Sequence, residues 1–276
     1  MCYVGMDIGG TNVRYGFAKD LAAKEIDFQK KPFTKIGNPY IEVEENIIKI
    51  IEMAPSDIKA IGISLAAIMD RKSGKVKTWP NNKCWNHYEL IQHLNDRYDV
   101  PIFIEDDANC GAIGEYYYLS DTIRNMAYIT IGTGIGCGLI LNGSLYIGNS
   151  GFAGELGHIC IEKESNNICS CGSKGCFQAI ASGSAVLKNY VKSSENIIMV
   201  IFNLVMCLDV PLVIIGGGVI NKIPKLILDI ENKVNERLKY FERKMLVQGA
   251  KLGEFSGTYG ALQLLKNEIY KGDNEL

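Results

Sequence analysis

A strand–glycine–strand segment occurs twice in this chain, and this repetition constrains the fold more than any other feature. Residues 3–8 are apolar and β-leaning, the pair Gly9-Gly10 interrupts them, and residues 12–18 resume the strand pattern. Residues 126–131 and 136–141 repeat the arrangement as two strands around a second glycine turn, about half a chain later. Two copies of one local pattern at this separation indicate a duplicated fold with one glycine hairpin in each half.

Strands and helices alternate along the rest of the chain. Apolar spacing predicts strands at residues 25–33, 59–65, 101–105, 211–215 and 245–248, and helices at 40–53, 86–97, 107–119, 177–191, 195–208, 222–240 and from 256 onward. This alternation predicts a mixed α/β sheet in each half. We expect a small lobe of residues 1–109 with about 261–276, and a large lobe of residues 110–260.

Charge and hydropathy exclude several classes of protein. The chain carries 29 Lys and Arg against 31 Asp and Glu, so it lacks the basic excess of a nucleic-acid-binding protein. Its longest apolar stretch, residues 196–208, is broken by Asn203 and is too short to span a bilayer. The N-terminal segment carries Asp7 where a signal peptide would be apolar. We therefore expect a cytoplasmic protein that binds neither nucleic acid nor a membrane.

The cysteines divide into single residues and one cluster. Six stand alone and are expected to fill the core: Cys2, Cys84, Cys110, Cys137, Cys160 and Cys207. The other three, Cys169, Cys171 and Cys176, lie close together in the sequence and follow His158. Three thiolates and an imidazole satisfy a tetrahedral Zn²⁺ with no open position, which predicts a structural zinc site. The alternative is a set of buried thiols or a redox pair.

Three glycine turns follow strands and can bring backbone N–H groups close to phosphates. Their residues are Asp7, Gly9, Gly10, Thr11 and Asn12 in the first turn, Gly132, Thr133 and Gly134 in the second, and Gly216 and Gly217 in the third. Thr11 and Asn12 add side-chain donors, and Asp7 can hold Mg²⁺ through water. Any one of these turns alone is more simply an ordinary hairpin turn. The three together favour a nucleotide phosphate site.

A run of acids stands where a predicted strand meets a predicted helix. Glu105, Asp106 and Asp107 end the strand and begin the helix. Such a carboxylate can act as a general base toward a hydroxyl group. The alternative at Asp107 is a helix cap, because Asp is a preferred N-cap residue.

At these residues the chain resembles the ROK family of repressors and sugar kinases. The resemblance rests on residues 7–12 (DIGGTN), 151–158 (GFAGELGH) and 169–176 (CSCGSKGC), together with the turn at Gly132. It implies the duplicated, actin-like (hexokinase-like, ribonuclease H-like) two-lobe fold, with ATP and a sugar bound in the cleft between the lobes. It also implies the same four zinc ligands and a homodimer formed through the large lobe.

The resemblance also assigns roles to individual residues. It favours Asp107 as the general base and implies sugar contacts from Asn81, Asp106, Glu155, His158 and Gln178. Asp106 departs from the family pattern, which has Asn there, and Gln178 departs from a usual Glu. Ala67 departs too, placing a methyl group where the family has Gly. The 39 residues between Cys176 and Gly216 are fewer than in comparable members.

Two classes of function remain open at the level of sequence. One is an ATP-dependent kinase that transfers the γ-phosphate to the 6-hydroxyl of a hexose, with glucose or allose expected and N-acetylmannosamine as the alternative. The other is a non-catalytic, sugar-binding ROK protein, which the departures at Asp106 and Gln178 and the short large lobe motivate. A DNA-binding repressor is not expected, because only six residues precede Asp7, where family repressors carry a winged helix.

Overall fold

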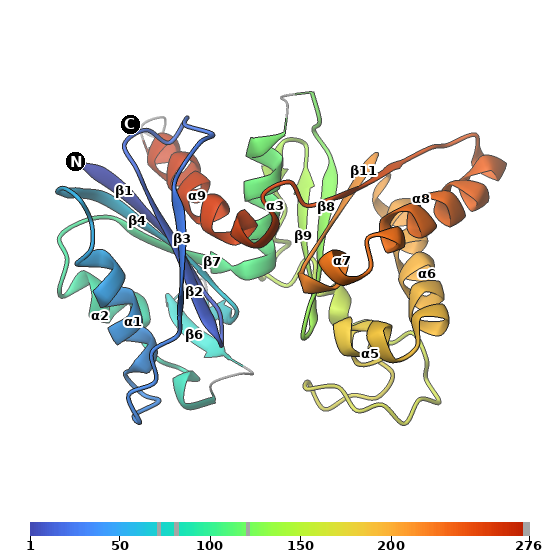
Figure 1. Cartoon of the computed structure of the whole chain (residues 1–276), viewed down its shortest axis with the longest axis horizontal. Helices are drawn as coiled ribbons and strands as arrows, with labels where there is room; N and C mark the ends of the chain where they lie inside the picture. Colours follow the sequence, from blue (N-terminus) through green and yellow to red (C-terminus); the bar gives the residue numbers. More distant parts are fainter. Residues whose placement is uncertain (71–72, 80–82, 120–121, 273–276) are drawn as a thin grey trace. The chain divides into compact units, whose positions relative to one another are not determined.

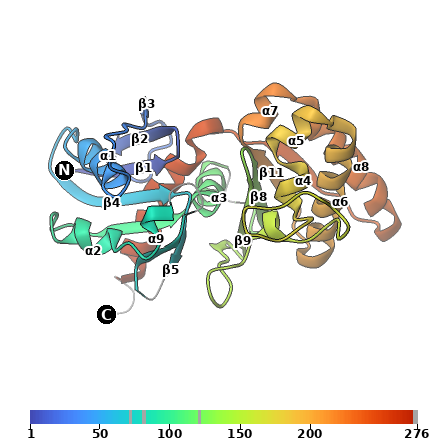
Figure 2. The ribbon, with the colours of Figure 1, turned by 90° about the horizontal axis from the view of Figure 1, so that it is seen from below.

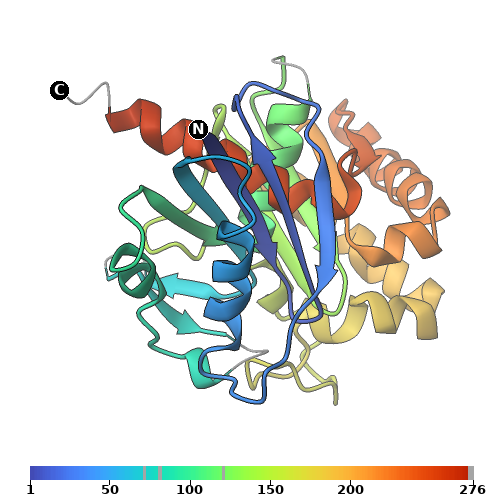
Figure 3. The same cartoon turned by 60° about the vertical axis from the view of Figure 1, so that its left-hand side comes forward.

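The chain divides into two compact units. The computed structural model describes residues 1–70, 73–79, 83–119 and 122–272. Unit 1 comprises Met1–Tyr118 with Phe255–Leu276, and unit 2 comprises Leu119–Glu254. Figures 1, 2 and 3 follow the chain through both units from three directions.

Unit 1 contains a five-stranded sheet in the order β3-β2-β1-β4-β7. The strands are β1 (Cys2–Ile8), β2 (Asn12–Ala18), β3 (Phe28–Pro32), β4 (Ile58–Leu65) and β7 (Ile102–Asp106). β1 pairs antiparallel with β2 and parallel with β4, and β4 pairs parallel with β7. A separate hairpin of β5 (Ile68–Asp70) and β6 (Lys75–Thr78) was not expected from the sequence.

Side-chain alternation gives this sheet two different faces. One face packs Val4, Met6 and Ile8 of β1 against α1 (Glu42–Ile51) and α2 (Leu90–Asn95), forming the main core of unit 1. The other face carries Gly5 and Gly62 and lies against α9 (Ser256–Gly272). Figure 3 shows α9, in red, crossing the strands of this sheet. The 3₁₀ turn η1 (Lys83–Trp85) precedes α2.

Helices α3 (Asp107–Tyr118) and α9 lie side by side in unit 1 (Figure 1). Their backbones approach so closely that a Cβ atom at Gly260 would overlap the carbonyl group of Cys110. Likewise, a Cβ at Gly62 would overlap the carbonyl group of Ala261. This packing places all of α3 in unit 1, so the first unit extends to Tyr118 and resumes at Phe255. The sequence pattern predicts that the small lobe ends at residue 109 and resumes at about residue 261.

Unit 2 repeats the strand order of unit 1. Its sheet runs β10-β9-β8-β11-β12, with β8 (Met126–Ile131), β9 (Ile135–Leu141), β10 (Ser144–Leu145), β11 (Leu212–Gly216) and β12 (Leu246–Gly249). β8 pairs antiparallel with β9 and parallel with β11, as β1 does with β2 and β4. The predicted duplicated α/β fold is therefore confirmed.

The helices of unit 2 pack on the apolar side chains of its sheet. They are α4 (Phe177–Ala181), α5 (Gly183–Lys188), α6 (Tyr190–Leu208), α7 (Gly218–Lys222) and α8 (Lys225–Leu238), with 3₁₀ turns η2 (Leu156–His158), η3 (Lys239–Phe241) and η4 (Gly253–Phe255). Figure 2 shows α4–α8 gathered beside β8 and β11. The single helix expected at 177–191 is wrong, because Ser182 is extended (ψ 171°) and separates α4 from α5.

Helix α6 is longer than the sequence suggested. It spans 19 residues with a mean hydropathy of 1.5 over its most apolar window, so its length and composition alone would allow it to cross a membrane. Ile197, Ile201 and Leu204 of this helix are buried in the core of unit 2. This packing is that of the core helix of a folded domain.

The contact between α3 and α9 gives a test in which two physical effects have opposite signs. Gly→Ala inside a helix normally gains about 1 kcal/mol of stability. At Gly260 the added methyl group meets the Cys110 carbonyl, so Gly260→Ala is expected to lower the free energy of unfolding by about 1–3 kcal/mol. Urea unfolding measures the change. Gly218→Ala is the control, because its Cβ would meet nothing within 4 Å. Stabilisation by Gly260→Ala would contradict the close approach.

Candidate functional site

In unit 1, Asp7 lies at the carboxyl-terminal part of β1 between two polar neighbours. Sheet register places it directly opposite Arg14 of β2 and Ser64 of β4. The Ser64 hydroxyl donates to Asp7 Oδ1 over 2.7 Å, and Arg14 Nη1 lies 3.2 Å from Asp7 Oδ2. Both contacts therefore follow from strand pairing, because paired residues on neighbouring strands share one face of the sheet.

The environment of Asp7 disfavours its negative charge. Burial raises the pKa of the Asp7 carboxyl above its ordinary value, and the Ser64 hydroxyl and the Arg14 guanidinium only partly oppose this effect. The first turn of α9 closes the site, since a Cβ at Gly257 would lie 3.1 Å from both Asp7 Oδ1 and Ser64 Oγ. A carboxylate kept in such a place despite its desolvation cost is typical of a functional group.

The acids at the end of β7 have separate roles. Glu105 is buried (4% exposed), and its Oε1 accepts from the Asp106 N–H over 2.9 Å and from Asn109 Nδ2 over 3.0 Å. Asp106 Oδ1 accepts from the backbone N–H groups of Ala108 (3.0 Å) and Asn109 (3.3 Å). Asp106 is thus the side chain that caps α3, and the helix-cap interpretation of Asp107 is wrong.

Asp107 is the first residue of α3 and stands beside this cap. Strand pairing of Leu65 with Asp106 determines where β7 ends and the helix begins. The neighbouring Cys110 is buried, and burial, followed by the charges of Glu105, Asp7 and Asp106, raises the pKa of its thiol well above the usual value. The carboxyl-terminal end of this sheet therefore concentrates carboxylates.

The first glycine turn joins β1 to β2 in unit 1. The Gly9 N–H donates to the Asn12 carbonyl over 3.0 Å, and the Thr11 carbonyl accepts from the Phe33 N–H over 2.9 Å. Gly10 and Thr11 are exposed at the tip of the turn. Their backbone N–H groups and the Thr11 hydroxyl are therefore at the surface of unit 1.

In unit 2 the structure brings the other glycine segments together. The Gly132 carbonyl accepts from the N–H of Gly183, the first residue of α5, over 2.8 Å. Gly217 has a positive φ of 88°, and a Cβ there would overlap the Ile131 backbone at the end of β8. The second and third turns and the start of α5 thus meet at the end of β8. Sequence reasoning missed Gly183, because its contact with Gly132 is tertiary.

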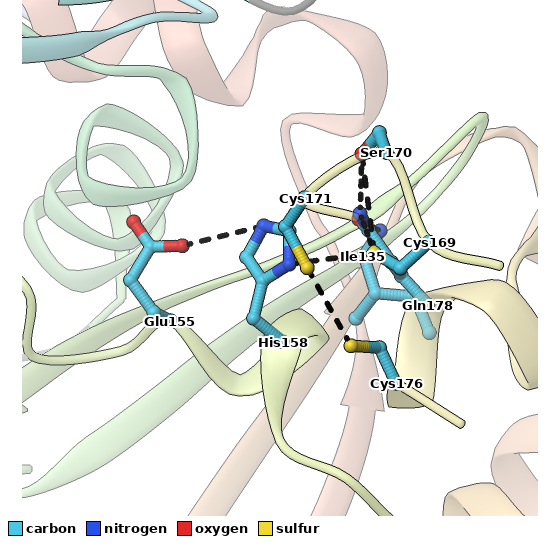
Figure 4. Close-up of polar contacts among 8 residues, drawn as sticks. All are labelled: Ile135, Glu155, His158, Cys169, Ser170, Cys171, Cys176 and Gln178. Atoms are coloured by element: carbon cyan, nitrogen blue, oxygen red, sulfur yellow. Dashed lines mark hydrogen bonds and ion pairs between the residues drawn. The ribbon is translucent and has the colours of Figure 1, made fainter. Parts of the chain in front are cut away.

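The thiol and imidazole groups predicted to bind metal also converge in unit 2 (Figure 4). One ligand atom from each of His158, Cys169, Cys171 and Cys176 lies within 4.8 Å of the other three. Cys171 Sγ lies 3.7 Å from Cys176 Sγ, and Cys169 Sγ lies 3.5 Å from His158 Nδ1. A tetrahedron with Zn–S bonds of about 2.3 Å and Zn–N bonds of about 2.0 Å has edges of about 3.8 Å and 3.5 Å. The four residues therefore fit Zn²⁺.

Local backbone geometry makes this convergence possible. The Cys169 N–H donates to the Ser173 carbonyl over 2.8 Å, which closes a tight turn, and Gly172 in that turn has φ 89°. Contact with the backbone N–H of Ser173 lowers the pKa of the Cys171 thiol to about 6. Burial, followed by the neighbouring thiols, raises the pKa of Cys176 to about 12. The cluster thus supplies one thiolate readily at neutral pH.

Gln178 and Glu155 adjoin this cluster from opposite sides, as Figure 4 shows. Gln178 Nε2 donates to Cys169 Sγ over 3.1 Å, and Gln178 Oε1 accepts from the Ile135 N–H over 3.4 Å. Glu155 Oε2 lies 3.9 Å from His158 Nε2. The two ring nitrogens of His158 therefore face different groups, Nδ1 the thiol and Nε2 the carboxylate.

Several sequence predictions at or near these sites need correction or lie outside the structure. Asn81 lies outside the described residues. The Ala67 side chain is buried in the core of unit 1 (2% exposed), so its methyl group is not on a binding surface. Of the cysteines expected to fill the core, Cys2, Cys110 and Cys137 are buried, but Cys84, Cys160 and Cys207 are exposed. Sequence reasoning gave no role to Arg14 and Ser64, although a polar residue inside an apolar strand is a usable signal.

Two units with one strand order define the duplicated actin-like fold. A solved structure of this fold, a ROK family glucokinase from Streptomyces griseus in complex with glucose and AMPPNP, superposes with a TM-score of 0.81 and 25% identity. The alignment covers 97% of this chain and 100% of that one. The ROK family model matches residues 3–200. The chain belongs to the ROK family.

Relatives of known name include both a regulator and an enzyme. The xylose repressor of Bacillus subtilis (strain 168) is 34% identical over 194 residues, which cover 67% of this chain and 49% of the repressor. The N-acetylmannosamine kinase of Vibrio vulnificus (strain CMCP6) is 29% identical over 248 residues, which cover 79% of this chain and 83% of the kinase. The chain spans about half the length of the xylose repressors it matches.

The metal cluster predicts the metal content of the purified protein. We expect one zinc ion per chain by elemental analysis, and loss of this zinc in Cys171→Ser, because a structural site needs its full ligand set. Cys207→Ser is the matched control, since Cys207 is exposed and is not a member of the cluster. Equal zinc content in both variants would contradict the assignment.

The burial of Asp7 predicts a gain in stability when its charge is removed. Because the folded-state pKa lies above the ordinary 3.8, the ionised group costs stability at every pH above the folded pKa, and this cost disappears below 3.8. Asp7→Asn is expected to raise the melting temperature at pH 7 and to leave it unchanged near pH 3. The exposed Asp99→Asn serves as control. A lower melting temperature for Asp7→Asn at pH 7 would contradict the assignment.

Proposed function

We propose that the chain is an ATP-dependent sugar kinase that transfers the γ-phosphate to the 6-hydroxyl of a hexose, with Asp107 as the general base. The observation that carries this proposal is the position of Asp107 at the carboxyl end of β7. Asp106 caps α3 through its Oδ1, and Asp107 is the first residue of the helix that follows. A carboxylate placed at a strand end can accept the proton of a sugar hydroxyl as the phosphoryl group arrives.

The phosphate chemistry is assigned to the glycine turns and Asp7. Backbone N–H groups at residues 9–12, 132–134 and 216–217 would bind the phosphates of ATP. Asp7 would hold hydrated Mg²⁺ through water, because its two oxygens already contact Ser64 and Arg14. Bound Mg²⁺ would neutralise charge on the transferring phosphoryl group. The glucokinase with glucose and AMPPNP among its structural neighbours supports ATP as the donor.

We assign sugar binding to Asn81, Asp106, Glu155, His158 and Gln178. Glu155 and His158 offer a carboxylate and an imidazole nitrogen within 3.9 Å of each other, a pair that can accept from and donate to sugar hydroxyls. When a bound sugar buries such groups, they discriminate between sugars, because an unmatched donor or acceptor then costs about 1–3 kcal/mol. Zn²⁺ bound by the four-residue cluster would fix the position of His158.

Only similarity to relatives indicates which hexose the chain would accept. Glucose or allose is the first expectation, and the similarity to the Vibrio vulnificus kinase favours N-acetylmannosamine as the alternative. We also propose that the protein acts in the cytoplasm as a homodimer, an assembly that only the family resemblance supports.

A second candidate is a non-catalytic, sugar-binding ROK protein. The similarity to the Bacillus subtilis xylose repressor favours it, as do the departures at Asp106 and Gln178. This candidate predicts that the chain binds a sugar without consuming ATP. It also predicts that sugar binding does not require Asp107 as a base.

Turnover by a variant of Asp107 separates these candidates. In an assay of ADP release over glucose, allose and N-acetylmannosamine, Asp107→Asn is expected to lower kcat by about 10²–10⁴-fold, the usual contribution of a general base. Asp99→Asn is the control and is expected to keep turnover, because Asp99 is exposed and belongs to none of the assigned sites.

Two results would contradict the kinase proposal. One is full activity in Asp107→Asn. The other is the absence of ADP release with every sugar, in protein that is folded and holds its zinc.

A further inference from the structure

The side chain of Gln178 connects two parts of unit 2 that are far apart in the sequence. Its Nε2 donates to Cys169 Sγ (3.1 Å) and to Ser170 Oγ (3.0 Å) in the cysteine loop. Its Oε1 accepts from the N–H of Ile135 (3.4 Å), the first residue after the second glycine turn. Figure 4 shows the amide between these partners. All of these contacts lie within unit 2.

The chemistry of the partners fixes the orientation of the amide. The backbone N–H of Ile135 can only donate, so the carbonyl oxygen of Gln178 must face it. The two hydrogens on Nε2 then point to the sulfur and to the Ser170 hydroxyl. A glutamate at this position could still accept from Ile135, but it could not donate to the sulfur.

Packing around Gln178 leaves its amide little freedom on the side of the glycine turn. A Cβ at Gly134 would lie 2.9 Å from Gln178 Oε1, and a Cβ at Gly157 would lie 3.3 Å from the same atom. Gly134 belongs to the turn assigned to phosphate binding, and Gly157 precedes His158 of the cluster. The carbonyl oxygen is therefore enclosed by backbone from both sites.

We propose that Gln178 is a positioning residue that couples the candidate zinc cluster to the second glycine turn. Its N–H group donates to Cys169 Sγ, and its carbonyl group holds the backbone at Ile135. The coupling rests on the proposed zinc site, though not on the identity of the sugar or on turnover.

Coupling of this kind works in both directions. Zinc binding fixes Cys169 and hence the amide of Gln178, which orders the backbone that follows the glycine turn. An ordered glycine turn likewise favours the arrangement of the four metal ligands. Metal content would therefore affect the proposed ATP site and not only the His158 side of the cluster.

The first experiment measures zinc dissociation into a chromophoric chelator from the full chain and from Gln178→Glu. We expect zinc to leave Gln178→Glu about 10-fold faster or more, the usual effect of removing a hydrogen bond to a metal ligand. Asn167→Asp is the matched control, because it adds the same charge in the same loop while its side chain contacts Ser165. The control is expected to release zinc at the wild-type rate.

A second measurement uses the wild-type protein alone and does not depend on the folding of any variant. Hydrogen exchange at the Ile135 amide is followed by mass spectrometry before and after a chelator removes the zinc. We expect exchange at this amide to become about 10-fold faster without metal. Gln178 Oε1 accepts from this amide, and without metal Cys169 would no longer hold the side chain of Gln178 in place.

The outcomes distinguish a failure of the coupling from a failure of the zinc site or of the proposed kinase activity. Unchanged zinc release in Gln178→Glu, or unchanged exchange at Ile135 after zinc removal, would overturn the coupling. A wild-type chain that holds no zinc would overturn the zinc site and the coupling together. A chain without kinase turnover that gives both expected results would overturn the proposed activity and leave the coupling supported.

Discussion

The register of the sheet in unit 1 is the constraint on which the position of Asp7 and its polar neighbours depends. Direct pairing across β2, β1 and β4 places Arg14, Asp7 and Ser64 in one row on one face. The opposite face buries Ile8 and Leu65 in the core. A slip of one residue would exchange the two faces, so burial of the apolar residues also fixes the polar row. The packing that fixes the position of Asp7 also buries its carboxyl group, and this burial makes its negative charge unfavourable.

The candidate site of unit 2 is built by contacts of a different kind. Its chemistry depends on close approach of backbone segments. Glycines at 183 and 217 allow their segments to approach the backbone of Gly132 and Ile131 at the end of β8. The cysteine loop then brings three sulfurs and one imidazole together through tight turns. Side-chain pairing therefore builds the site of unit 1, whereas backbone contact and a metal cluster build that of unit 2.

Local pattern predicted the strands well, and tertiary contacts explain most of what it missed. The strand at residues 126–131 was predicted with its observed bounds, because an apolar run ended by glycine leaves little choice. The helix expected at 177–191 is divided, since Gly183 bonds to the distant Gly132. The grouping of His158 with Cys169, Cys171 and Cys176 could be predicted from their spacing. The sequence could not show which of two adjacent acids caps α3, because strand pairing at Asp106 determines where the helix begins.

The product of the reaction is the sharpest test of the proposed transfer of a phosphoryl group to a sugar hydroxyl. Phosphorus NMR of the full chain with ATP, Mg²⁺ and each hexose would identify the ester formed. We expect a new phosphomonoester whose signal is split by the two protons on C6 of one sugar. Calorimetric binding of a sugar with no phosphomonoester formed from any of them would contradict the proposed kinase activity and favour a sugar-binding regulator.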